Sequence, residues 1–176
     1  KNDIATKHSV MLVLIRSFFI AASLLFAFQM DAQTWSHSYQ KGDFGEDSFH
    51  FASAYKSNAQ LSSASYIDYT LSVHVGRNTK GTKPFVYIGG DIVESLAWTI
   101  DAVKWTFEVK GEYITKTFIP SKKENAVFFD KSDSAILVPL LKTGSRVRIE
   151  ALTSSGNLFK EDFKLTGSTA AISKVQ

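Results

Sequence analysis

Residues 66–75, with the sequence YIDYTLSVHV, constrain the fold of this chain more than any other segment. Apolar side chains occupy every second position, and polar side chains occupy most of the positions between them. Successive side chains of a strand point to opposite faces of a sheet, so this spacing is typical of a half-buried antiparallel strand. We expect His74 to face solvent and the apolar set to face the core. That set is Ile67, Tyr69, Leu71, Val73 and Val75.

Other segments show strand-like spacing as well, and turns separate them. Aromatic residues make up 13% of the chain, and such side chains pack well on a pleated sheet. Within a strand at 48–55 we expect Phe49 and Phe51 to share one face and His50 to lie on the outer face. Further strands are expected at 35–39 and 84–90, at two places within 96–109 around a turn at 101–102, and at 111–119, 125–130, 146–152 and 158–165, with a polar connection at 120–125.

Residues 132–144, SDSAILVPLLKTG, change the apolar spacing and predict a short helix. Ser132 or Ser134 is a candidate N-cap, because a hydroxyl accepts a hydrogen bond from a free N–H of the first turn. Gly144 provides a stop signal. Pro139 lacks the N–H that a helix interior requires, so it argues against a long helix.

The chain ends in a strand, a break and a small apolar tail. Gly167 permits the backbone conformation that leaves the sheet. Ser168 or Thr169 is then expected to cap a terminal helical turn. The apolar side chains of this turn would close an open end of the sheet; they are Ala170, Ala171, Ile172 and Val175.

The pattern as a whole predicts an all-β fold, either an antiparallel β-sandwich or a partly open barrel, of about eight strands with two short helices. With 176 residues in the chain, we expect a single domain over residues 34–176. The formal charge of +3 is spread along the sequence, so we expect no nucleic-acid partner. Cysteine is absent, which excludes thiol catalysis, thiolate metal sites and a lipid-modified cysteine.

Residues 1–33 have the layout of upstream residues followed by a secretory signal peptide. Arg16 precedes an uncharged apolar run at 17–28, and Ala32 is a small residue at the expected cleavage position. Twelve helical residues span roughly 18 Å, less than the roughly 30 Å of a bilayer core, so we expect no stable transmembrane span after cleavage. Met30 is large for its position, which leaves an uncleaved anchor as the alternative. The expected location is the periplasm or the outside of a bacterial cell.

The residue types that carry chemistry form no recognisable motif in this sequence. The histidines of the predicted domain are not spaced as metal ligands; they are His37, His50 and His74. An acidic loop lacks the EF-hand pattern and is expected to be a solvated turn; it contains Asp43, Glu46 and Asp47. A carboxylate pair for glycoside hydrolysis would need a fixed separation across a cleft, and the candidates are Asp68, Asp91, Glu94 and Asp101. We expect no catalytic residue, no metal site and no cofactor.

Three aromatic residues are our candidates for contact with a ligand or partner: Tyr87, Trp98 and Trp105. Aromatic rings present flat faces to sugars and peptides. The alternative is that these side chains belong to the core, where most aromatic side chains are buried.

The order of elements over residues 100–175 resembles the invasion-associated locus B family of small exported bacterial proteins. The segments that carry the resemblance are IDAVKWTFEV, NAVFFD, SAILVPLLKTG, SRVRIEA and SSGNLFKEDFKLTGSTAAISKV. Before residue 100 the resemblance is limited to Trp35, a Trp soon after the export signal. Family members often carry one cysteine after this Trp and another near the C-terminus, where this chain has Tyr39 and Val175. The resemblance implies a periplasmic or envelope-exposed β-sandwich, linked in some members to host-cell entry, and it transfers no catalytic residue.

From these observations we expect an exported, non-enzymatic protein that binds an envelope or host protein, or another envelope component, through a sheet face or loops. The first alternative is a module that binds a small ligand or a glycan through exposed aromatic side chains. A hydrolase with paired carboxylates is a third hypothesis. The sequence specifies neither the partner nor the oligomeric state.

Overall fold

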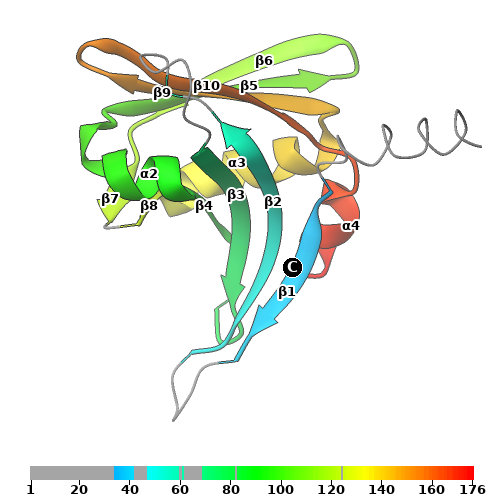
Figure 1. Cartoon of the computed structure of the whole chain (residues 1–176). Helices are drawn as coiled ribbons and strands as arrows, with labels where there is room; N and C mark the ends of the chain where they lie inside the picture. Colours follow the sequence, from blue (N-terminus) through cyan, green and yellow to red (C-terminus); the bar gives the residue numbers. More distant parts are fainter. Residues whose placement is uncertain (1–33, 42–46, 60, 62–68, 82, 124) are drawn as a thin grey trace, which may run out of the picture. The chain divides into compact units, whose positions relative to one another are not determined.

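The fold is built from antiparallel strands in two sheets, as seen in a computed structural model that describes residues 34–41, 47–59, 61, 69–81, 83–123 and 125–176 (Figure 1). In the described residues the strands are β1 (Ser36–Gln40), β2 (Phe49–Ala59), β3 (Tyr69–Asn78), β4 (Phe85–Gly89), β5 (Ala102–Val109), β6 (Glu112–Phe118), β7 (Ser121–Lys123), β8 (Ala126–Phe129), β9 (Arg146–Thr153) and β10 (Gly156–Lys164). The helices are α2 (Asp91–Leu96), a 3-10 helix η1 (Ala97–Thr99), α3 (Lys131–Thr143) and α4 (Ser168–Ser173).

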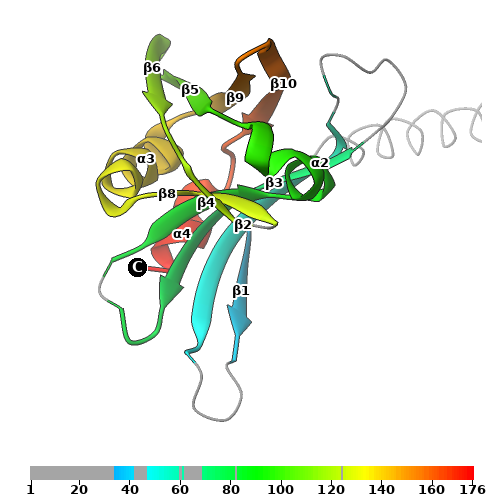
Figure 2. The same ribbon diagram turned by 90° about the vertical axis from the view of Figure 1, so that its left-hand side faces the viewer.

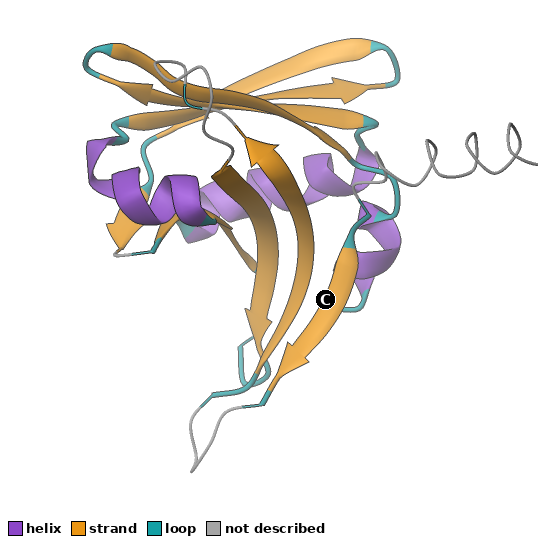
Figure 3. Ribbon diagram, in the orientation of Figure 1, coloured by secondary structure: helices purple, strands orange, loops and turns teal. Residues whose placement is uncertain are grey.

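The larger sheet has the strand order β1-β2-β3-β4-β8-β7, and the smaller sheet has the order β10-β9-β5-β6. Figure 3 shows the smaller sheet at the top and helices at the level between it and the larger sheet. This arrangement confirms the expected all-β sandwich with short helices. The expected polar connection at 120–125 is wrong in one respect, because it contains the edge strand β7.

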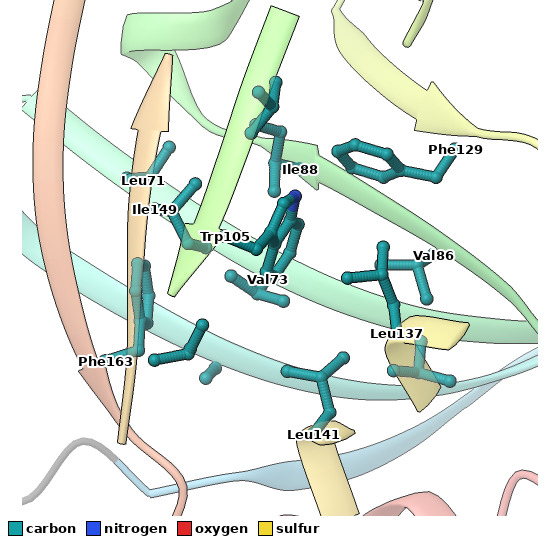
Figure 4. Close-up of a cluster of buried hydrophobic side chains, with 14 of the residues drawn as sticks. Leu71, Val73, Val86, Ile88, Trp105, Phe129, Leu137, Leu141, Ile149 and Phe163 are labelled. Carbon is teal, nitrogen blue, oxygen red and sulfur yellow. The ribbon is translucent and has the colours of Figure 1, made fainter. Parts of the chain in front are cut away.

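The core lies where the two sheets and α3 meet (Figure 4). Leu71, Val73 and Val75 on β3 are completely buried, which confirms the inward face expected from their alternation. The smaller sheet contributes Trp105 and Ile149 to the same cluster. Each large apolar side chain buried in this way stabilises the fold by about 1.5–3 kcal/mol relative to its exposed state.

The two faces of β2 are the reverse of the expected ones. Ala52 and Ala54 are completely buried on the core face, whereas Phe51 is only half-buried on the opposite face. Helix α4 packs against β1 and β2, and small side chains leave room for it. Successive side chains of a strand point to opposite faces. Because the alanines face the core, the larger aromatic side chains next to them in the sequence face away from it.

Residues 91–99 form a helix and a 3-10 turn, so the strand expected to lead through Trp98 to Ile100 is wrong. Gly90 has a φ of 103°, and a Cβ there would lie 2.5 Å from the carbonyl oxygen of Thr70. Only glycine fits this turn, which takes the chain from β4 directly into α2. The buried side chains then follow helical spacing; they are Ile92, Val93 and Ala97.

Helix α3 (Lys131–Thr143) lies where a short helix was expected and begins one residue before the segment 132–144. Asp130, rather than Ser132 or Ser134, is the N-cap, and its carboxylate accepts a hydrogen bond of 2.7 Å from the N–H of Asp133. Pro139 lies inside the helix and is exposed. Pro139 has no N–H to donate to the carbonyl of Ala135, one turn earlier. Ala135 is exposed, so water can bond this carbonyl instead.

Helix α4 ends the chain on the core side of the larger sheet. Ile172 and Val175 are completely buried, as expected, whereas Ala170 is exposed. Gly167, with a φ of 83°, is the N-cap residue of α4. The hydroxyls of Ser168 and Thr169, expected to cap their own helix, instead donate hydrogen bonds to carbonyls at the end of α3.

Contacts group residues Gln33–Gln176 into one compact unit. The predicted signal peptide at 1–33 lies outside the described residues. Of the helices that the structure describes, none is both long enough and apolar enough to cross a membrane.

We predict that Ser168→Ala lowers the free energy of unfolding by about 1–3 kcal/mol, because it leaves a buried carbonyl without its donor. The hydroxyl is completely buried and lies 2.7 Å from the carbonyl oxygen of Leu141. Ser173→Ala in the same helix is the control, since Ser173 is exposed. Urea unfolding of both variants measures the difference, and equal stability would show that the link between α3 and α4 does not stabilise the fold.

Candidate functional site

The structure places the three predicted contact residues in different environments. Trp105 is completely buried and packs edge-to-face on Phe129, with 5.3 Å between the ring centroids. Trp98 is 64% exposed on η1. Tyr87 is half-buried on β4. Trp105 belongs to an aromatic group within the core, whereas Tyr87 belongs to one outside it.

That group, the aromatic cluster, lies on the outer face of the larger sheet, which we define as the face opposite the core. Strand pairing aligns Phe51 with Gly76 and Gly76 with Phe85, and it aligns Tyr87 with Phe128. Because paired residues project from the same face of a sheet, these rings gather over β2, β4 and β8. The aromatic cluster consists of Phe49, Phe51, Phe85, Tyr87 and Phe128, all half-buried.

Gly76 makes this cluster possible. A Cβ at this position would lie 2.5 Å from Cζ of Phe85 and 2.7 Å from Cε1 of Phe51. The two rings therefore occupy the space above β3 that a side chain would fill. They meet edge-to-face, with centroids 6.3 Å apart and planes at 84°, an arrangement that aromatic quadrupoles favour.

The cluster lines an open pocket of about 700 Å³. Its five rings form the apolar wall, together with Ala126. The polar part of the lining consists of Gln40, Lys41, Asp47, Lys123 and Asn125. We call this feature the aromatic pocket.

His74 lies next to the aromatic pocket and is buried, which corrects the expectation that it faces solvent. Ser53 and Ser72 each hydrogen-bond one of its ring nitrogens at 2.7 Å. The Tyr87 ring stacks on the imidazole, with centroids 4.3 Å apart and planes at 8°. Burial lowers the pKa of His74 to about 4, so the ring is neutral at neutral pH.

Tyr87 connects this buried histidine to the pocket wall. Its ring also stacks on Phe128, with centroids 5.0 Å apart. Burial, with a smaller contribution from Tyr55, raises the pKa of Tyr87 to about 12. The phenol therefore stays protonated and neutral over the physiological range, where it can donate a hydrogen bond.

One acidic side chain lies at the rim of the pocket. Asp47 forms an ion pair with Lys80 at 3.0 Å and accepts a hydrogen bond from the Asn78 amide. The hydrogen bond from Lys80 is the main reason why the pKa of Asp47 is below its usual value. The other two acidic residues of the predicted loop, Asp43 and Glu46, lie outside the described residues.

The structure does not bring the three histidines together. His37 and His50 contact each other at 3.2 Å. His50 lies on the core face of β2, whereas His74 lies on the outer face of β3, as its pairing with Ser53 shows. In the described part of the chain no group of three or more His, Cys, Asp or Glu residues could hold a metal ion.

The candidate carboxylates for hydrolysis lie near α2 or outside the described residues. Asp91 and Glu94 are exposed on α2, and Asp101 pairs with Lys122 at 3.7 Å. Asp68 is among the residues that the structure does not describe. Of the three described carboxylates, Asp91, Glu94 and Asp101, none lines the aromatic pocket.

The outer face of the smaller sheet is charged rather than aromatic. Arg148 forms a bidentate pair with Asp162 through bonds of 2.9 and 3.0 Å, and this pair lines a small pocket of about 170 Å³. Lys104 and Lys160 both pair with the buried Glu150. Because these charges are satisfied within the sheet, we do not consider this face a candidate site.

The residues that sequence reasoning missed are four of the five rings: Phe49, Phe51, Phe85 and Phe128. A usable signal was present, since Phe49/Phe51 and Phe85/Tyr87 are pairs at strand spacing on both sides of the strand that carries Gly76. Reading them as core side chains hid this signal, because one strand alone does not show which of its faces is buried.

We predict that the stability of the wild-type protein falls more steeply with acid than that of His74→Gln. An unfolded chain with an ordinary histidine pKa of 6.5 takes up a proton as the pH falls through that value, while folded His74 stays neutral down to about 4. The unfolded state therefore binds more protons in this window, and stability decreases by up to about 3 kcal/mol as the pH falls from about 6.5 to about 4.

Glutamine keeps neutral hydrogen-bonding groups near the two serines but does not titrate, so the variant should lack this contribution. Urea unfolding of both proteins across the same pH range measures the difference. Carboxylates such as Asp162 destabilise both proteins in acid and cancel in the comparison. Parallel pH profiles would contradict the assignment of a buried, neutral His74.

Comparison of this chain with protein-family models, with curated proteins and with solved structures finds no match. The resemblance to the invasion-associated locus B family therefore stays a prediction from sequence.

Proposed function

We propose that the domain is a non-enzymatic binding module that holds one small, mainly apolar ligand in the aromatic pocket. The single observation that carries this proposal is an open pocket of about 700 Å³ walled by five aromatic rings. Pockets for small molecules have volumes of about 300–1,000 Å³, apolar and aromatic walls, and a few polar groups that orient the ligand. The aromatic pocket fits each part of this description.

The exposed apolar surface itself supports binding. Half-buried phenylalanine side chains on a sheet face cost stability through contact with water, and a ligand that covers them recovers part of that free energy. The rings are held by one another and by strand pairing, so little conformational entropy is lost when a ligand enters. Such a preformed wall favours a planar or chain-like apolar body.

The distribution of polar groups favours an apolar ligand over a glycan. Sugars need many hydrogen-bonding groups next to the ring on which they stack, whereas the polar residues here belong to the rim. Among the described residues, the lining contains no nucleophile beside a base. The nearest hydroxyl–imidazole contacts are those of buried His74, and no carboxylate is hydrogen-bonded to its ring to stabilise an imidazolium ion.

We also propose that this module acts in the periplasm or outside the cell, on the basis of the signal-peptide layout of residues 1–33. We expect mass spectrometry of the protein from fractionated cells to find a mature N-terminus at Gln33, in the envelope or secreted fraction. A cytosolic protein that keeps the apolar run 17–28 would contradict this part of the proposal and leave the pocket unaffected.

We predict that phenylnaphthylamine, an uncharged fluorescent probe, binds the protein and that Phe128→Ala lowers its affinity about tenfold. The loss of one stacking ring and its apolar area accounts for an effect of this size. Fluorescence titration measures the affinity, and the probe should also raise the melting temperature, since it binds the native state.

Trp98→Ala is the matched control, because Trp98 is an exposed aromatic residue that does not line the pocket. We expect this variant to bind the probe as the wild type does. Equal losses in the two variants would show that the probe binds exposed aromatic surface in general. Absence of binding to the wild-type protein would contradict the proposed function.

A further inference from the structure

We infer that the ligand of the aromatic pocket is an amphiphile with an apolar body and one anionic head group, and that Lys123 holds that head group. This inference rests on the proposed function and names the chemical class of the ligand. It stands on the position of Lys123, on the charge balance of the rim and on the neutral donors that surround the wall.

Lys123 is the last residue of β7, the strand at the edge of the larger sheet, and it is exposed. Its ammonium nitrogen lies 4.9 Å from the centroid of the Phe128 ring. An ammonium group at this distance is attracted to the negative face of the ring, so the charge is held over the apolar wall. A ligand that lies on the neighbouring rings therefore brings its end close to this charge.

The other charges of the rim do not neutralise Lys123. Asp47 is already paired with Lys80 and bound by Asn78, so its charge is compensated. In the described residues neither Lys41 nor Lys123 has a carboxylate partner within ion-pair distance. Among the described residues that line the pocket, Lys41 and Lys123 are therefore cations without a carboxylate partner, and they complement an anion.

Neutral hydrogen-bonding groups complete the site. The side-chain amides of Gln40 and Asn125 line the pocket, and the Tyr87 phenol stays protonated. These groups can orient the oxygens of a carboxylate, sulfonate or phosphate ester without adding charge. Among the described residues of the lining, a metal ion or an organic cation would meet two lysines without ion-pair partners, which disfavour it.

The hollow shape favours a small amphiphile over a second copy of the chain. A two-fold dimer uses the same patch on both partners, and it would bring Lys41 and Lys123 of one copy close to the same lysines of the other. Dimer formation through the aromatic cluster is therefore the alternative that the experiment has to exclude.

The test compares two probes with a common aromatic body. Anilinonaphthalene sulfonate carries one negative charge, and phenylnaphthylamine carries none. With the full chain we expect Lys123→Gln to weaken sulfonate binding about fivefold, the size of one partly exposed charge pair, and to leave binding of the uncharged probe within about twofold. Raising the salt concentration from about 0.05 M to about 0.5 M should weaken sulfonate binding selectively.

Lys122→Gln is the matched control. Lys122 is the preceding residue on β7, but its ammonium group bonds the carbonyl of Trp98 and pairs with Asp101, away from the pocket. We expect it to change neither affinity. Phe128→Ala should weaken both probes, which separates the contribution of the wall from that of the charge.

Equal loss of both probes in Lys123→Gln would overturn the inference, because Lys123 would then be part of the wall. Unchanged sulfonate binding in this variant would overturn it as well, while the proposed function would stand on the uncharged probe. If the wild-type protein binds neither probe and Phe128→Ala abolishes a concentration-dependent dimer in sedimentation, a second copy covers the pocket and both proposals fail.

Discussion

The structure depends on packing against both faces of β3. On the core face, Leu71, Val73 and Val75 are completely buried beneath the smaller sheet and α3. On the outer face, His74 is buried by its neighbours, and Gly76 leaves its space to two phenylalanine rings. The larger sheet therefore has two apolar surfaces. One is covered by the rest of the domain, and the other is covered only in part, by rings that pack on one another.

Helix α3 determines where the wall of the aromatic pocket lies, although it is on the other side of β4. The Ser134 hydroxyl accepts a hydrogen bond of 3.0 Å from the N–H of Val86, which lies between two rings of the aromatic cluster, and it donates one to the carbonyl of Phe129. At its other end α3 is bonded to α4 through Ser168. Figure 2 shows both α2 and α3 on the side of the larger sheet that faces the smaller sheet. Because β4 is held from the core side, its rings are positioned before any ligand arrives, which lowers the entropic cost of binding.

Much of the fold could be predicted from the sequence, and the errors have physical causes. Alternation identified the core face of β3, because Leu71, Val73 and Val75 occupy every second position and are all completely buried. It failed on β2, where the apolar face with the smaller side chains is the buried one. It also failed after Gly90, where a helix of six residues was too short to recognise from its spacing. The pocket could not be predicted from spacing alone, because its rings come from three strands whose order in the sheet is set by tertiary packing.

The distribution of charge explains why the pocket rim, and not the smaller sheet, is the region available to a ligand. The smaller sheet carries more charged side chains, but arginine and lysine are matched there with carboxylates at short distance, as in the bidentate pair of Arg148 and Asp162. An incoming anion would have to replace a partner that is already held in place by strand pairing. Lys123 is held over a ring face instead, a weaker interaction that leaves its hydrogen-bond donors free. A lysine in this position can bind an anion without breaking an existing ion pair, and the neighbouring aromatic wall gives the apolar part of the same ligand a surface to cover.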